Sequence, residues 1–60
     1  MRFVIYLDNA SQYRWRLRAA NNKIIADSGE GYITKAACKH GIDLVKSTNA
    51  STSVVDLTED

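Results

Sequence analysis

The amino-acid sequence predicts one small α+β domain over residues 1–60: a three-stranded antiparallel meander, one amphipathic helix and a short C-terminal strand. Two patterns support this prediction. Apolar and cationic residues alternate along residues 13–19, as in a strand that buries one face, and residues 2–7 and 23–28 contain residue types that favour strands. From residue 35 to residue 47 the apolar residues recur with the helical period instead.

Residues 2–7 and 13–19 form the first two predicted strands. The polar or small residues between them, 8–12, suit a hairpin loop. A loop of this length places three apolar pairs on one face of the sheet: Phe3 with Leu17, Ile5 with Trp15, and Leu7 with Tyr13. The opposite face of the second strand carries the guanidinium groups of Arg14, Arg16 and Arg18.

The third predicted strand follows two asparagines. Asn21 and Asn22 suit the two positive-φ positions of a type I′ turn, which makes the second hairpin tight. In the register set by such a turn, Ile24 and Ala26 extend the apolar face. Three pairs of residues then lie opposite each other, of which the last is an expected ion pair: Arg18 with Ile25, Leu17 with Ala26, and Arg16 with Asp27.

A turn at residues 28–31 ends the sheet, and Thr34 is a suitable N-cap for a helix over residues 35–47. Gly41 lies in the middle of the apolar side of this helix, where glycine costs about 1 kcal/mol relative to alanine. We therefore expect the helix to approach the sheet closely at Gly41, over Trp15. The apolar side consists of Ala37, Cys38, Gly41, Ile42, Leu44 and Val45.

The C-terminal part of the sequence predicts a strand that is loosely attached. Residues 48–53 are small and polar, and residues 54–57 resume a strand-like pattern that reaches a neighbouring chain as easily as its own sheet. A chain of this size buries only about 60% of its unfolded surface, so a monomer is marginally stable. The single cysteine, Cys38, excludes an intrachain disulfide framework, and one cysteine with one histidine cannot form a zinc site within one chain. Oligomerisation is the remaining source of stability.

Composition narrows the class of protein further. The sequence has no apolar run of about eighteen residues and no signal-peptide core, so we expect a cytoplasmic protein that does not span a membrane. The net charge is +1, whereas a dedicated nucleic-acid binder usually has a larger basic excess.

No pattern predicts catalysis, and we expect no catalytic, cofactor-binding or metal-binding residues. Cys38 and His40 stand two apart in the predicted helix, so their side chains point about 160° away from each other. The segment 29–31 lacks the lysine and hydroxyl residue of a phosphate-binding loop. The sequence leaves one alternative, an active site built across two chains from His40 of one and Glu30 of the other.

Arg14, Arg16 and Arg18 are the candidate nucleic-acid contacts. Alternate side chains on a strand face lie about 6.7 Å apart, close to the phosphate spacing of an extended single strand. A solvated face or an intersubunit ion-pair surface explains the same pattern, because arginine is common on solvated sheet faces and Asp27 is expected to neutralise Arg16.

Several motifs along nearly the whole chain occur together in one family. They are Tyr6, the run 13–21, Ile25-Ala26, Glu30-Gly31-Tyr32, Thr34-Lys35-Ala36 and Gly41-Ile42. In this combination the sequence resembles the YegP-like family of small uncharacterised bacterial and archaeal domains. Asn22 stands where that family commonly has glycine.

The resemblance implies that a single unit forms a homodimer in which two units share one sheet and exchange their C-terminal strands. The exchanged strand comprises Val54, Val55 and Leu57. The family brings no established activity, and no cofactor or small-molecule ligand is implied. We therefore expect a homodimeric structural or interaction module without catalytic activity. The alternative is a nucleic-acid-binding protein that uses the arginines of the second strand.

Overall fold

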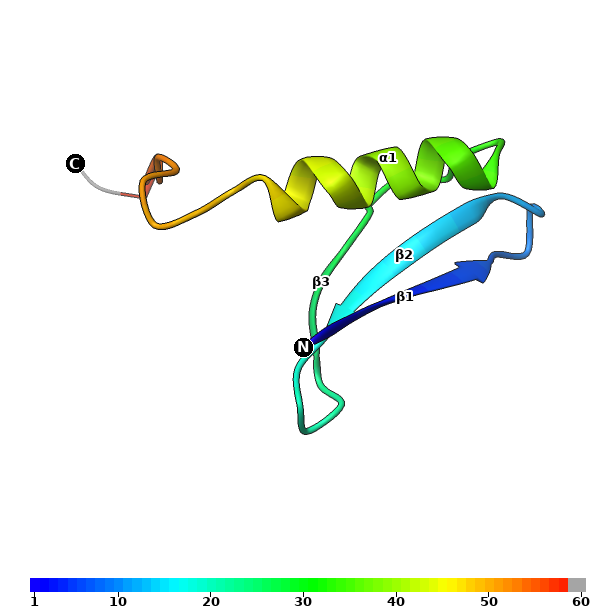
Figure 1. Ribbon diagram of the computed structural model, residues 1–60, viewed down its shortest axis with the longest axis horizontal. Coiled ribbons are helices and arrows are strands. Elements are labelled where there is room, and N and C mark those ends of the chain that lie inside the picture. The colour runs from blue at the N-terminus through cyan, green and yellow to red at the C-terminus, as the bar shows by residue number, and fades with distance from the viewer. Residues whose placement is uncertain (59–60) are drawn as a thin grey trace.

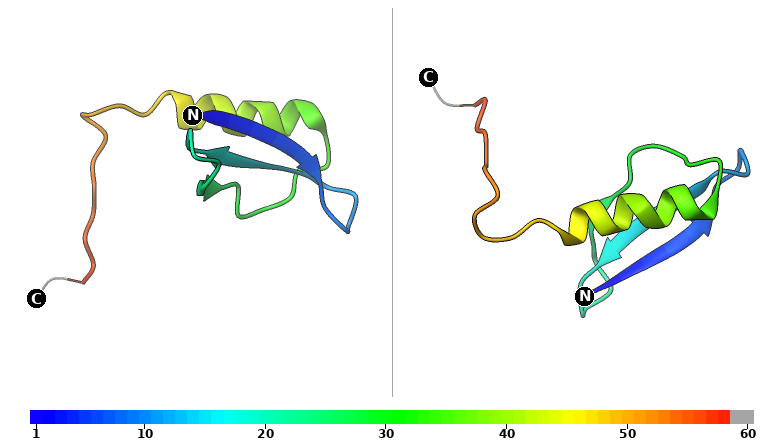
Figure 2. Two further views of the ribbon diagram at one scale, coloured as in Figure 1. Left: turned by 90° about the horizontal axis from the view of Figure 1, so that it is seen from below. Right: turned by 45° about the horizontal axis from the view of Figure 1, so that its top comes forward.

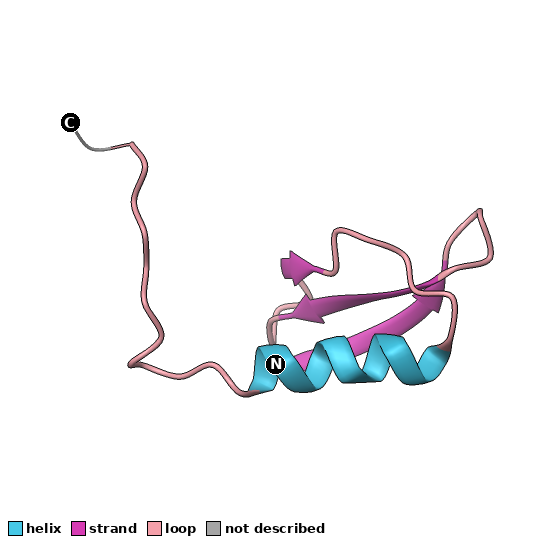
Figure 3. Cartoon of the chain, turned by 90° about the horizontal axis from the view of Figure 1, so that it is seen from above, coloured by secondary structure: helices cyan, strands magenta, loops and turns pink. Residues whose placement is uncertain are grey.

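The computed structural model describes residues 1–58 and has three strands and one helix in these residues (Figure 1). Their bounds are β1 (Arg2–Leu7), β2 (Tyr13–Arg18), β3 (Ile24–Asp27) and α1 (Lys35–Lys46). The strands pair antiparallel in the order β1-β2-β3. The helix and the strands form two layers, which Figure 3 shows from above. The predicted α+β meander with one helix is therefore confirmed.

The first hairpin has the predicted register, with Phe3, Ile5 and Leu7 opposite Leu17, Trp15 and Tyr13. Its loop is closed by a hydrogen bond of 2.9 Å from the Asp8 amide to the Gln12 carbonyl. Ser11 has a φ of 60°, which lets the chain turn back within three residues.

The second turn differs from the prediction. Only Asn22 has a positive φ, at 69°, and the Ala19 amide donates to the Lys23 carbonyl at 2.9 Å. The loop therefore has three residues, and a bulge follows it. Arg18 faces Ile24 and not Ile25 as predicted, and Ile24 is half exposed instead of buried. A three-residue loop shifts the return strand by one residue, and the bulge restores the predicted Leu17–Ala26 and Arg16–Asp27 pairs.

The segment that follows β3 continues to cover the same edge of β2. The Trp15 carbonyl accepts from the Ser28 amide at 3.0 Å, and Tyr13 and Tyr32 exchange two backbone hydrogen bonds of 2.7 Å. Between these contacts Gly29, with a φ of 70°, turns the chain. These pairings lead the chain back to the start of α1.

The helix begins as predicted, with the Thr34 hydroxyl accepting a hydrogen bond from the Ala37 amide at 3.1 Å. Among the described residues the core consists of three that are buried, Trp15, Cys38 and Ile42, with a ring of partly buried apolar residues around them. The predicted apolar side of the helix is wider than the surface it covers. Leu44 is 58% exposed and Ala37 is also exposed, because a three-stranded sheet is too narrow to cover both.

Gly41 lies close to the sheet, as predicted. A Cβ atom at Gly41 would lie 2.6 Å from the Tyr32 hydroxyl oxygen and 3.5 Å from Trp15 Nε1. The nearest neighbour is thus Tyr32, which the Tyr13 bridge brings beneath the helix, and Trp15 lies just beyond it.

The chain after Lys46 leaves the two layers. Figure 2 shows, from two further directions, that it extends away from the sheet and the helix. Residues 54–57 form no strand in the single chain, and Val54, Val55 and Leu57 are 92%, 77% and 90% exposed. The predicted C-terminal strand therefore has no partner strand within residues 1–58 of the same chain.

Candidate interaction site

The apolar side of β1 is only partly covered by the helix. α1 packs over β2, and two adjoining hollows lie between β1 and α1 and share Ile5 and Lys39. We call their union the β1–α1 groove. Its apolar floor includes Phe3, Ile5, Leu7, Tyr13 and Ile42, and its charged rim consists of Lys35, Lys39, Asp43 and Lys46.

Two of the rim lysines, Lys35 and Lys46, lie over aromatic rings of the floor. Lys35 Nζ is 5.8 Å from the centre of the Tyr13 ring, and Lys46 Nζ is 6.0 Å from the centre of the Phe3 ring. Both distances allow a cation–π attraction that keeps the lysine stems on the apolar surface. The groove therefore combines an apolar floor with a predominantly positive rim.

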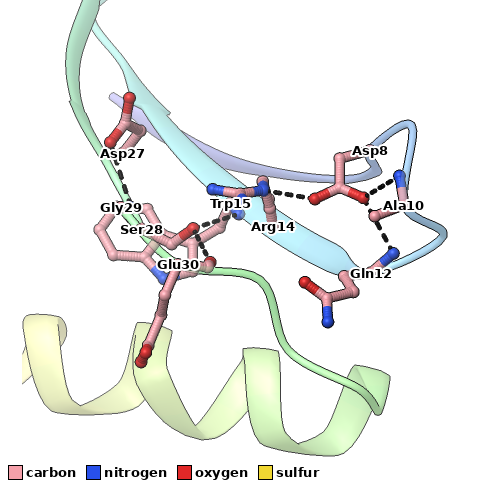
Figure 4. A network of polar contacts seen from close by, with 9 residues as sticks. All are labelled: Asp8, Ala10, Gln12, Arg14, Trp15, Asp27, Ser28, Gly29 and Glu30. Carbon is pink, nitrogen blue, oxygen red and sulfur yellow. Dashed lines mark hydrogen bonds and ion pairs between the residues drawn. The ribbon is translucent and has the colours of Figure 1, made fainter.

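The other face of the sheet carries the predicted arginines. Arg14 Nε donates to Asp8 Oδ2 at 2.5 Å, while Asp8 Oδ1 accepts from the Ala10 and Gln12 amides (Figure 4). The hydrogen bond from Arg14, followed by that from Gln12, lowers the pKa of Asp8. The same contact with Asp8 raises the pKa of Arg14. Arg14 thus ties the strand to the first hairpin loop.

The predicted ion pair between Arg16 and Asp27 is not formed, although the two residues face each other across β2 and β3. The Arg16 guanidinium lies over the Tyr6 ring instead, 4.3 Å from its centre. Asp27 Oδ1 accepts from the Gly29 amide at 3.2 Å. The Arg16 guanidinium and the Asp27 carboxylate thus each contact a different group, so the correct register did not produce the ion pair.

Arg18 Nη1 donates to the Asn22 carbonyl at 2.8 Å, at the β2–β3 turn. The three arginines therefore lie on one face, as the alternation predicted, and each has a partner within the chain. Contact between these arginines and nucleic acid stays a prediction.

No sequence pattern marks Arg2 as a candidate contact, although it lies opposite Arg18 on the same face. The predicted register of the first hairpin already implied this pair. The rim lysines were also missed, because only the position of the helix over β2 shows that they border a groove.

The residues considered for catalysis lie apart. Cys38 is fully buried, which raises the pKa of its thiol, and His40 is exposed. Within residues 1–58 no group of three or more histidine, cysteine, aspartate and glutamate residues is placed to hold a metal ion. No helix in that part of the chain is long and apolar enough to cross a membrane.

These features define a class: small domains with a three-stranded meander, one helix across it and an open apolar groove. The chain belongs to the family described as "Domain of unknown function (DUF1508)", whose model matches residues 8–56. The expected resemblance to the YegP-like family of small uncharacterised domains is consistent with this membership and is confirmed.

Known relatives agree with this assignment along almost the whole chain. The UPF0339 protein NMB1088 of Neisseria meningitidis serogroup B is 54% identical over 57 residues, which cover 95% of this chain and 100% of that protein. A UPF0339 protein of Methanosarcina acetivorans is 41% identical over 56 residues, 93% of this chain and 95% of that protein. A solution structure of a protein from Haloferax volcanii is 44% identical, with a TM-score of 0.83 and 92% of each chain covered.

Proposed function

We propose that this protein is a homodimeric structural or interaction module without catalytic activity, in which the β1–α1 groove of one copy holds residues 54–57 of the other. The observation that carries the proposal is the presence, on one chain, of an open apolar groove and an exposed apolar segment. Only three of residues 1–58 are buried in the single chain, so such an exchange would enlarge a small core.

The chemistry of the segment matches that of the groove. In an extended segment alternate side chains share a face, so Val55 and Leu57 together would meet the apolar floor. Asp56 lies between them and would point away from the floor, toward the opening of the groove that Lys35, Lys39 and Lys46 line. Opposite charges at the edge of an apolar contact favour the correct pairing and speed its formation.

The edge of the sheet offers backbone partners for the same segment. β1 is an edge strand, so its outer backbone groups are free to pair with an added strand. Residues 47–53 connect α1 to the segment and span up to about 25 Å when extended. This reach allows exchange between two copies without moving the helix.

The proposal also includes the compartment, which is the cytoplasm. Cys38 is a free, fully buried thiol, and the proposed dimer needs no disulfide for its stability. This supports a protein that works in the cytoplasm, where thiols stay reduced.

Light scattering at micromolar concentration tests the proposal, with a dimer expected at twice 6.7 kDa. The double variant Val55→Asp and Leu57→Asp should be monomeric, because charges would enter the apolar floor. Ser51→Asp, which adds a charge to the exposed linker, is the matched control and should stay dimeric. A wild-type mass of 6.7 kDa, or an unchanged dimer in the double variant, would contradict the proposal.

A further inference from the structure

Two arginines meet at one corner of the sheet, on the face away from the groove. Arg2 and Arg18 are direct cross-strand partners at the start of β1 and the end of β2. Both bind Asn22 in the β2–β3 turn. Arg2 Nη2 donates to Asn22 Oδ1 at 2.6 Å, and Arg18 Nη1 donates to the Asn22 carbonyl at 2.8 Å. One residue with a positive φ thus binds both guanidinium groups.

This arrangement leaves two positive charges without compensation. Like charges directly opposite each other destabilise an antiparallel pair. Within residues 1–58 neither Arg2 nor Arg18 has a carboxylate within ion-pairing distance, and Asn22 is neutral. The other two arginines of this face differ, because Arg14 is paired with Asp8 and Arg16 lies on the Tyr6 ring.

Unused hydrogen-bond donors accompany the two charges. A guanidinium group has five N–H donors, and Asn22 takes one from each arginine. Arg2 is exposed and Arg18 is partly exposed, so the remaining donors are accessible to a ligand. Two planar forks with a combined charge of +2 match a tetrahedral dianion, since guanidinium binds phosphate oxygens in a bidentate manner.

We propose that Arg2 and Arg18, positioned by Asn22, form a phosphate-binding site. The ligand is either free inorganic phosphate or the terminal phosphate of a phosphate monoester, since both present the same dianionic group. The site uses none of the groove residues, so it does not depend on the proposed exchange of residues 54–57.

Titration of the full-length protein with inorganic phosphate, at an ionic strength held constant with chloride, tests the site. The signals of arginine Nε–H groups in ¹⁵N NMR spectra report binding directly. We expect saturable shifts at Arg2 and Arg18, and none at Arg14, whose Nε is occupied by Asp8. A parallel titration with glycerol phosphate tests the phosphate monoester. Whichever of the two ligands has the lower dissociation constant is the preferred one.

Three variants separate an anion site from a purely structural contact. Arg2→Gln and Arg18→Gln should each weaken phosphate binding by about tenfold, as expected when one charged fork is lost. Asn22→Gly keeps the positive φ but removes the Oδ1 that holds Arg2, so it should also weaken binding while the fold is retained. Lys23→Gln, which removes an exposed cation of the same turn, should leave affinity within about twofold.

Two outcomes would overturn the proposal. One is a shift with phosphate that does not saturate, or that equal ionic strength of chloride reproduces, which would indicate general screening. The other is an unchanged affinity in folded Arg2→Gln and Arg18→Gln protein, with folding verified from the amide spectrum. In either case the contacts with Asn22 only fasten β1 to the turn.

Discussion

The Tyr32 hydroxyl lies directly beneath Gly41, 2.6 Å from the position that a Cβ atom would take there. The helix can approach the sheet this closely because residue 41 has no side chain. Tyr32 is placed there by its two backbone hydrogen bonds to Tyr13, so the bridge between these two tyrosines determines the height of the helix above the sheet.

Replacing Gly41 by a large residue should lift the helix. We expect Gly41→Leu to lower the free energy of unfolding by about 2 kcal/mol, because overpacking outweighs the gain of about 1 kcal/mol in helix propensity. Ala37→Leu places the same side chain on an exposed part of α1 and should change stability little. Urea unfolding measures both. A Gly41→Leu protein as stable as wild type would disprove the close approach.

Acid should weaken the protein through Asp8. Its pKa is lowered in the folded state, so its contribution to stability is present above the unfolded pKa of about 3.9 and is lost as pH falls through the folded value. We expect Asp8→Asn to be less stable than wild type at pH 7 and to lose less stability on acidification. Denaturant unfolding across this pH range measures the difference.

The partner of Asp8 supplies a second test of the same contact. Arg14→Gln removes that contact and should also reduce the loss of stability on acidification. If Asp8→Asn retained the full acid dependence of wild type, the contact with Arg14 would not be its source.

The two asparagines of the second turn should respond differently to the same change. Asn22 has a φ of 69°, where a side chain other than asparagine or aspartate costs about 1 kcal/mol, and its Oδ1 accepts a hydrogen bond from Arg2, so Asn22→Ala should lower the thermal midpoint. Asn21 has a negative φ and loses only a long hydrogen bond to the Lys23 amide, so Asn21→Ala should lower it less. Calorimetry compares the two variants, and an equal effect would contradict the single positive φ.

Reversing one charge on the rim of the groove should weaken the proposed dimer. Lys39 borders both hollows, so Lys39→Glu would place a carboxylate near Asp56 of the other copy and should raise the dissociation constant about fivefold. High salt should reduce this difference, because it screens exposed charges. Lys23→Glu, at the β2–β3 turn outside the groove, is the matched control. Sedimentation at several concentrations measures the dissociation constants. Equal effects of both variants would argue against a contact between the rim and residues 54–57 of the other copy.

Much of the fold follows from local patterns in the sequence. The pattern of residues 2–7 and 13–19, with a short polar loop between them, leaves one register that puts Phe3, Ile5 and Leu7 on the same face as the apolar residues of β2. Thr34 and the change to a helical period locate the start of α1 in the same way. These features depend on residues close together in the chain, and a shift of one residue would expose a whole apolar face.

The second turn is a feature that local patterns did not predict correctly. Two adjacent asparagines suit several turn types, and the choice of a three-residue loop moved Ile24 out of the apolar face. The ion pair expected between Arg16 and Asp27 failed for a related reason. Register brings two residues opposite each other, but Arg16 contacts Tyr6 of β1 and Asp27 accepts from the nearby Gly29 amide instead.

Periodicity alone therefore determined the strands, the helix and the two faces of the sheet. Only the tertiary structure decided which parts of those faces are left open. The β1–α1 groove exists because α1 packs over β2, and that position depends on Gly41, Tyr32 and Trp15, which come from three separate segments. The contact of Arg2 with Asn22 likewise joins two distant segments, although the hairpin register already placed Arg2 opposite Arg18. Contacts between distant segments depend on the packing of the whole chain, which no local pattern contains.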